Sequence, residues 1–437
     1  MSAPNLSPEA AASPATLVVR TLRLDESVDL PGHIPLGVSA AWLRHGQGMV
    51  ALGAAWTVQT AGPHRFAAAS AAFRALAARA RVDDEVRTRT SGLIGLGSFS
   101  YADASARSSR LVVPRALLGV HDGESFLTVV GVDEEPVVPT SWRDLFPSTP
   151  VMPGGSEELE IEADHTPDEY QALVHQAVAE IREGRAEKVV LSERTAVRSE
   201  NRIEPAVLLA RLAHDYPSTW VYHLDDVIGA SPEMLAQTEN SRLFSRVLAG
   251  TRPVADDGEL DEVDRRVFRS DAKELSEHAF AVDSVVERLE GLAQDIDVSP
   301  EPFVLRLPGL EHLASDVSAR LLHGVTSLDV ASRLHPSAAV SGTPRESADE
   351  IIARLEPHDR GGYAAPVGWM DAQGDGQWAI ALRMAHLTAD KAVTLQAGGG
   401  LVAASDPVSE HAEALAKCRP MLRALRGEPE EPPTGLV

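Results

Sequence analysis

The chain has 437 residues, and its 44% hydrophobic and 24% charged residues are the balance of a globular protein with a substantial core. Its 64 acidic and 40 basic residues give a formal net charge of −24, which argues against nucleic acid and anionic membranes as partners. A single cysteine, Cys418, excludes a disulfide framework and thiolate metal clusters. Residues 1–16 predict a disordered tail rather than a signal peptide, and no apolar run predicts a membrane span, so we expect a cytoplasmic protein.

Residues 17–160 are predicted to form a small N-terminal lobe. The β-rich segments 15–22 and 125–132 predict strands, and the alanine-rich segment Phe66–Arg81 predicts a helix between them. Residues 136–160 are rich in Pro, Ser and Glu, which is typical of a surface connection.

Residues 161–426 are predicted to form the larger part of the fold, followed by a flexible tail at 427–437. Thr166 caps a helix that has a proline in its first turn and runs to about Glu183. We expect further helices at 204–214, 261–292, 326–334 and 347–355, and strands at 188–192, 219–225, 233–238, 242–249, 302–306, 365–370 and 376–385. Strands interleaved with long helices, without a regular βαβ rhythm, predict an α+β fold.

Two helix-like segments each carry a pair of glutamates three residues apart. Glu274 and Glu277 form the first pair, and Glu410 and Glu413 form the second. Residues at this spacing share one helix face, so two facing helices would bring four carboxylates to one point. Such a cluster repels itself unless a divalent cation binds, and carboxylate oxygens suit Mg²⁺. Either pair alone is equally typical of a solvated helix face.

Two charged residues border apolar strands. Lys188 begins the run Val189–Leu191, where partial burial would lower its pKa and let it act as a base. Glu233 precedes the apolar Met234, and a carboxyl there has either a raised pKa suited to a general acid or an ion pair with an arginine such as Arg246. Most lysines at strand starts are simply solvated.

Two glycine-containing segments predict turns whose backbone could approach an anion. The first is Leu248–Pro253, with Gly250 and Thr251 at its centre. The second is the glycine turn at 396–402, directly before the second glutamate pair.

Taken together, these segments resemble the chorismate-utilising enzymes, which comprise isochorismate, salicylate, anthranilate and aminodeoxychorismate synthases. The resemblance runs in order from about Thr166 to Leu425, and residues 17–160 match only loosely. Its blocks are Lys188–Ser192, Gly229–Glu233, Leu248–Pro253, Lys273–His278, His312–Leu313, His335–Arg345, Gly362–Trp369, Ala379–Arg383 and the segment 396–417. The resemblance implies a large, mostly antiparallel β-sheet core flanked by helices.

The resemblance also implies roles for single residues. Glu277 and Glu413 would bind Mg²⁺, with Glu274 and Glu410 supporting them. The substrate chorismate would be held by Gly250, Thr251, His312, Ala339, Val340, Tyr363, Arg383, Gly398, Gly400 and Lys417, of which Tyr363 and Arg383 hold the enolpyruvyl carboxylate. An arginine suits this task because its planar fork meets a carboxylate in two hydrogen bonds.

The mechanism that the resemblance implies uses Lys188 and Glu233 as a catalytic pair. Neutral Lys188 would take a proton from a water that attacks C2 of the ring, and protonated Glu233 would give its proton to the departing C4 hydroxyl. Mg²⁺ would bind the ring carboxylate and fix the ring between the two groups.

Three positions indicate which member of the family this is. Anthranilate synthases usually carry Gln where this chain has Lys188, and aminodeoxychorismate synthases carry a nucleophilic Lys where it has Ala249. Ala339 is typical of isochorismate synthases, whereas salicylate and anthranilate synthases tend to have Thr. We therefore expect an isochorismate synthase, an isomerase working as a monomer without a glutamine amidotransferase subunit.

Two alternatives stay open at this point. One is a salicylate synthase that goes on to eliminate pyruvate from isochorismate, and the other is a non-catalytic protein that keeps the fold. Whether the product would feed menaquinone, siderophore or salicylate synthesis depends on neighbouring enzymes.

Overall fold

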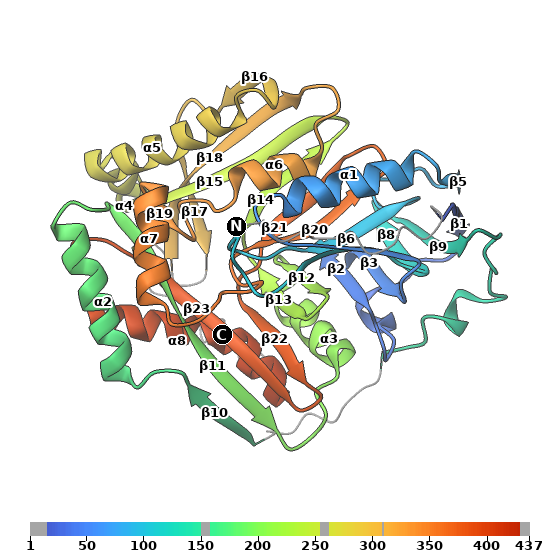
Figure 1. Cartoon of the computed structure of the whole chain (residues 1–437), viewed down its shortest axis with the longest axis horizontal. Coiled ribbons are helices and arrows are strands. Elements are labelled where there is room, and N and C mark those ends of the chain that lie inside the picture. Colours follow the sequence, from blue (N-terminus) through green and yellow to red (C-terminus); the bar gives the residue numbers. More distant parts are fainter. Residues whose placement is uncertain (1–14, 150–157, 254–261, 308–309, 429–437) are drawn as a thin grey trace, which may run out of the picture.

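The structure is a computed structural model that describes residues 15–149, 158–253, 262–307 and 310–428 (Figure 1). Within these ranges the side chains of Thr251, Glu277 and His312 are among those that are not described. Two large sheets form the centre of the molecule, and helices lie around them. Their ladders are antiparallel, apart from one parallel pair between β1 and β5.

The first sheet has 13 strands among the described residues, in the order β10-β11-β23-β22-β13-β12-β2-β3-β8-β9-β1-β5, with β19 beside β11. Its strands are β1 (Leu17–Leu24), β2 (Ala40–Arg44), β3 (Gln47–Leu52), β5 (Arg81–Asp84), β8 (Ala116–His121), β9 (Glu124–Val132), β10 (Leu159–Ala163), β11 (Lys188–Ser199), β12 (Trp220–Leu224), β13 (Val227–Ser231), β19 (Gly342–Thr343), β22 (Met384–Ala389) and β23 (Ala392–Leu401).

The second sheet has 10 strands among the described residues, in the order β16-β18-β15-β14-β21-β20-β6-β7-β4, with β17 beside β18. Its strands are β4 (Trp56–Thr60), β6 (Ile94–Ser98), β7 (Ser109–Val113), β14 (Met234–Glu239), β15 (Arg242–Pro253), β16 (Ala293–Val298), β17 (Phe303–Leu307), β18 (Leu310–Leu321), β20 (Pro366–Asp371) and β21 (Gly376–Ile380). Apolar residues of both sheets share one buried cluster, which includes Trp42, Trp369 and Trp378.

Helices cover the outer faces of both sheets (Figure 1). The helices are α1 (Arg65–Ala77), α2 (Pro167–Arg182), α3 (Pro205–Asp215), α4 (Glu262–Ser270), α5 (Ala272–Leu289), α6 (Ser327–Leu334), α7 (Arg345–Leu355) and α8 (Pro407–Arg426), with short 3-10 turns at Pro31–His33 and Trp142–Asp144. Helix α5 packs on β15 and β18, while α2, α7 and α8 lie against β11 and β23. No helix of the described ranges is long and apolar enough to cross a membrane.

The N-terminal and C-terminal parts of the chain contribute to the same two sheets. Strand β2 pairs with β12 in the first sheet, and β6 pairs with β20 in the second. The segment 17–160 is therefore built into the sheets that carry the rest of the chain.

The α+β prediction is confirmed, and so are most of the predicted helices. The Thr166 side chain accepts from the Glu169 amide, and the Thr326 side chain accepts from the Asp329 amide, each in a capping box that begins its helix where the sequence indicates. Helices α3 and α7 also lie where they were predicted.

Five predicted elements are wrong in extent. The strand expected at 242–249 continues to Pro253. The helix expected to reach Arg81 ends at Ala77, and Arg81 begins β5. The single helix expected at 261–292 is two helices, because the Asp271 side chain accepts from the Glu274 amide and caps a new start. The strand expected at 376–385 ends at Ile380, and the strand at 188–192 continues to Ser199.

Candidate active site

Lys188 is the first residue of β11, and its partly buried side chain lies against a glycine of the neighbouring strand. A Cβ added at Gly400 would lie 2.7 Å from Lys188 Cε and 3.4 Å from its Nζ. A side chain at position 400 would therefore displace the end of the lysine from this place, which glycine leaves free for it. The predicted glycine turn at 396–402 is therefore wrong, since Gly398 to Gly400 continue strand β23 and pair with β11.

Glu233 lies in the connection between β13 and β14, where backbone bonds fix its position. Its carbonyl accepts from the Ile380 amide over 3.0 Å, and its own amide donates to Ser231 Oγ over 3.2 Å. Burial raises the pKa of the Glu233 carboxyl to about 7, although the charges of Lys188 and Lys417 oppose the shift. The alternative partner Arg246 instead forms an ion pair with Asp316, with 2.6 Å between Nε and Oδ1.

Helix α8 presents Glu410, Glu413 and Lys417 beside the β23 glycines. Lys417 Nζ lies 2.6 Å from Glu413 Oε1 and donates to the Gly398 carbonyl over 2.7 Å. Glu410 accepts from Ser405 Oγ over 2.6 Å, and its pKa is raised, chiefly by burial and also by the charge of Glu413. A Cβ at Gly399 would lie 3.1 Å from Glu410 Oε2 and 3.6 Å from Glu413 Oε1, so both carboxylates lie close against the strand backbone at this glycine.

The other glutamate pair lies on α5, where the side chain of Glu274 reaches strand β15. A Cβ at Gly250 would lie 3.1 Å from Glu274 Oε2. The predicted tight turn at 248–253 is wrong, because Gly250 belongs to β15 and forms a bulge with a φ of 76°. The side chain of Glu277 lies outside the described residues.

The carboxylates of α5 and α8 are suited to Mg²⁺ by their chemistry. Both pairs supply hard oxygen donors, and described members of each pair lie close to the backbone of Gly250 and Gly399. In the part of the chain that the structure describes, no three acidic, histidine or cysteine side chains are arranged as a metal site. The side chain of Glu277 is not among those that the structure describes, so the four-carboxylate site stays a prediction.

Tyr363 and Arg383 lie close together at the edge of this region. The Tyr363 side chain is buried, and burial raises the pKa of its hydroxyl. Burial lowers the pKa of Arg383, whereas Tyr363 and Glu413 act in the opposite direction. Arg383 has a φ of 50°, unusual for a residue other than glycine, and therefore holds a costly backbone conformation between β21 and β22.

The remaining predicted substrate contacts lie on two segments. Ala339 and Val340 belong to the loop 335–343, where the Val340 amide donates to the Ser337 carbonyl over 3.1 Å. Thr251 and His312 are backbone partners on β15 and β18, and their side chains lie outside the described residues.

Two buried pairs of titratable side chains close to these residues are not predicted by the sequence. The carboxylate of Glu193, 4% exposed, has a pKa raised to about 7 by burial and by Asp164, and its Oε2 lies 3.6 Å from His411 Nε2. Glu356 and Arg360 form the second pair, with 2.6 Å between Oε1 and Nη2. Every second side chain along β11 points inward, and Glu193 occupies one of these positions. This alternation is the sequence signal that predicts its burial.

The raised pKa of Glu233 predicts a stability change with pH. Between its ordinary value of 4.5 and about 7, the folded chain holds this proton more tightly than the unfolded chain, so the free energy of unfolding falls as pH rises. The contribution lost is at most about 3 kcal/mol. Glu233→Gln has no carboxyl that titrates at this position. In denaturant unfolding, the free energy of unfolding of the variant should therefore rise relative to that of the wild type by about 3 kcal/mol between pH 4.5 and 8. A difference that is constant with pH would contradict the buried carboxyl.

Known proteins match this chain over most of its length. The sequence profile of the family described as "Chorismate binding enzyme" matches residues 42–426. Isochorismate synthase DhbC from Bacillus subtilis is 35% identical over 289 residues, which are 62% of this chain and 72% of that protein. Anthranilate synthase component 1 from Streptomyces coelicolor is 39% identical over 271 residues, 60% of this chain and 52% of that protein.

A solved structure shares the fold. MenF, the menaquinone-specific isochorismate synthase from Escherichia coli, superposes with a TM-score of 0.76 and covers 94% of this chain and 95% of its own, at 24% identity. At this identity the likeness concerns the fold alone.

Proposed function

The chain belongs to the chorismate-binding enzymes, and we propose that it converts chorismate to isochorismate in a Mg²⁺-dependent reaction. The observation that carries this proposal is the pairing of a basic and an acidic group of suitable character. Lys188 and Glu233 lie within electrostatic reach of each other, and burial raises the pKa of the Glu233 carboxyl to about 7. The 35% identity to an isochorismate synthase supports the same reaction.

In the proposed mechanism Lys188 is the general base. Its side chain lies along the β23 backbone at Gly400, and it is partly buried there. In its neutral form it takes a proton from a water that attacks C2 of the chorismate ring. A positioned base removes the need to form free hydroxide.

Glu233 is the general acid on the other side of the reaction. With a pKa of about 7, this carboxyl keeps its proton at a pH where an ordinary glutamate has lost it. It donates that proton to the C4 hydroxyl, which leaves as water while the ring double bonds shift. Because one hydroxyl replaces another, we expect the reaction to be freely reversible.

The charged side chains around this pair bind the substrate's carboxylates. Arg383 and Tyr363 hold the enolpyruvyl carboxylate, for which the planar guanidinium is well shaped. Lys417, which contacts the Gly398 carbonyl, adds positive charge beside the ring. Glu413 and Glu277 would hold Mg²⁺, with Glu410 and Glu274 supporting them, and the cation would neutralise the ring carboxylate.

Ala339 and Ala249 support isochorismate as the product rather than salicylate or an aminated ring. Ala249 is 8% exposed on β15 and provides no amine nucleophile, so water remains as the attacking group. Ala339 leaves the loop 335–343 without the threonine hydroxyl that the salicylate and anthranilate enzymes tend to have.

The proposal predicts a product and a metal requirement that one experiment measures. Purified protein incubated with chorismate and Mg²⁺ should form isochorismate, resolved by chromatography. Excess EDTA should lower the rate by at least about 100-fold, because the carboxylate ligands then repel the anionic substrate, and added Mg²⁺ should restore it. Protein heated before the assay serves as the blank.

Each of the alternative outcomes would contradict part of the proposal. Accumulation of salicylate and pyruvate would indicate a salicylate synthase, and unchanged chorismate would support a non-catalytic protein. Full activity in EDTA would remove the metal from the mechanism.

A further inference from the structure

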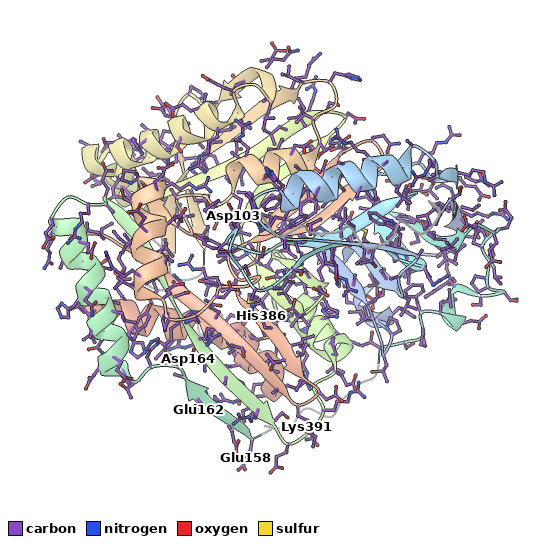
Figure 2. All side chains as sticks on the ribbon, in the orientation of Figure 1. Asp103, Glu158, Glu162, Asp164, His386 and Lys391 are labelled. Atoms are coloured by element: carbon purple, nitrogen blue, oxygen red, sulfur yellow. The ribbon has the colours of Figure 1, made fainter. Side chains whose placement is uncertain are left out.

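Strand β11 lacks a neighbouring strand along part of the edge that faces away from β23. At the far end β10 covers this edge as far as Asp164, whose amide donates to the Arg194 carbonyl over 2.9 Å. Figure 2 labels Asp164 at this point, beside β11. At the near end β19 pairs with Lys188 and Val189, and the Val190 amide donates to the Ser341 carbonyl over 2.8 Å. The Val190 carbonyl and the Ser192 amide lie between these two partners.

A buried ion pair fills this gap in the ladder. Arg360 Nη2 donates to the Val190 carbonyl over 2.8 Å. Glu356 Oε1 accepts from the Ser192 amide over 2.8 Å and from Ser192 Oγ over 2.9 Å. The two charged groups thus take the places that a carbonyl and an amide of a neighbouring strand would occupy.

The same guanidinium also reaches the loop 335–343. Arg360 Nη1 donates to the Val340 carbonyl over 2.7 Å, and its Cζ lies 4.5 Å from the centre of the Tyr101 ring. Arg360 Nε donates to Glu356 Oε2 over 2.8 Å, so the pair is bidentate and fixed in orientation. One side chain therefore joins the strand that begins with Lys188 to the loop that carries Ala339 and Val340.

Stability alone is a weak reason to keep such a pair. The Arg360 and Glu356 side chains are 3% and 4% exposed, and removing two charges from water offsets most of their attraction. An apolar pair of similar volume would often be as stable, but it could not bind three backbone groups in fixed directions.

We propose that Glu356 and Arg360 are positioning residues, which fill the gap between β19 and β10 beside β11 and hold the strand that begins with Lys188 at a fixed distance from Val340 of the loop 335–343. The role rests on the proposed function, in which Lys188 is the base and the loop is one wall of the substrate site. Neither residue needs to touch the substrate. Their effect arises because a base displaced by about 1 Å loses on the order of 100-fold in rate.

The test compares Arg360→Lys with Arg354→Lys in the full chain. A lysine keeps a positive charge for Glu356 but cannot bond the carbonyls of Val190 and Val340 at once. Arg354 lies on α7 and pairs with Glu180 at the surface, so its replacement is the matched control. We measure kcat and KM with chorismate per native molecule, and amide hydrogen exchange of peptides covering 186–194 and 337–343 without substrate.

For Arg360→Lys we expect a kcat lower by about 30- to 100-fold with KM changed less than about 3-fold, and faster exchange in both peptides. Glu356→Gln should show the same pattern, because the glutamine keeps an acceptor for the Ser192 amide but leaves Arg360 without its charge partner. If Arg360→Lys does not fold, the positioning role is tested with Glu356→Gln instead. Arg354→Lys should match the wild type in all measurements.

Unchanged exchange in either peptide would overturn the proposed connection between strand and loop. Faster exchange in both peptides with a kcat within 3-fold of the wild type would contradict the positioning role. It would still show that the ion pair holds the strand and the loop together. A wild-type protein that leaves chorismate unchanged would refute the proposed function instead, and the exchange measurements would still decide whether the pair holds the two segments together.

Discussion

Replacing Lys188 with alanine should reduce turnover of chorismate by at least about 10³-fold, because the attacking water would lose its only positioned base. The fold should survive the change. Lys188 is the first residue of β11, and the backbone pairing of this strand with Thr343 and Leu401 does not involve the side chain. Steady-state kinetics with Mg²⁺ present, together with a thermal unfolding curve, measures both expectations.

The matched control is Lys391→Ala. Lys391 is an exposed lysine that bonds the Glu200 carbonyl over 2.6 Å, and Figure 2 shows it at the opposite end of β11. This variant should keep wild-type kcat and KM. A Lys188→Ala protein that retains more than about a tenth of the wild-type kcat would refute the base assignment.

Replacing Glu233 with glutamine should lower kcat by about 10²- to 10⁴-fold, because the C4 hydroxyl would then have to leave without a proton donor. Glutamine has nearly the same shape, so substrate binding should change far less than turnover. The backbone bonds of residue 233 to Ile380 and Ser231 are independent of the acid group and should hold the position. The measurement is kcat and KM for the forward reaction.

Glu239→Gln provides the comparison for this change. Glu239 lies at the other end of β14 and is exposed, with only a distant pairing of 3.7 Å to Arg89. Its replacement should leave kcat unchanged. If Glu233→Gln behaves like Glu239→Gln, another group donates the proton.

Local signals predicted the elements that depend on local interactions. Thr166 and Thr326 begin helices because their side chains bond amides three residues later, which needs no distant partner. Asp271 forms the same kind of helix cap between two helical segments. The sequence alone predicts one continuous helix there, because the residues on both sides of Asp271 have helical character.

Features that depend on distant contacts were interpreted wrongly. Gly398 to Gly400 looked like a turn in the sequence, whereas they form a strand whose glycines make room for Lys188 and the Leu191 carbonyl. Which residue will approach a glycine is decided by strand pairing between segments about 200 residues apart, as in the pairing of Leu191 with Gly399. Local propensity carries no information on that pairing.

The predicted site was assembled by resemblance more than by chemistry. In the structure Lys188 lies against Gly400, and Lys417 lies against Glu413, while the catalytic and binding roles stay a prediction. The Glu356–Arg360 pair was not identified, because a charged pair four residues apart is usual on a solvated surface and only the packing of β11 makes it buried.

The central claim is that water, activated by Lys188, becomes the new hydroxyl of the product. The measurement that tests it most directly is the incubation of the protein with chorismate and Mg²⁺ in ¹⁸O-labelled water, followed by mass spectrometry of the separated product. We expect isochorismate carrying one labelled oxygen at C2. Isochorismate without label, or chorismate left unchanged, would contradict it.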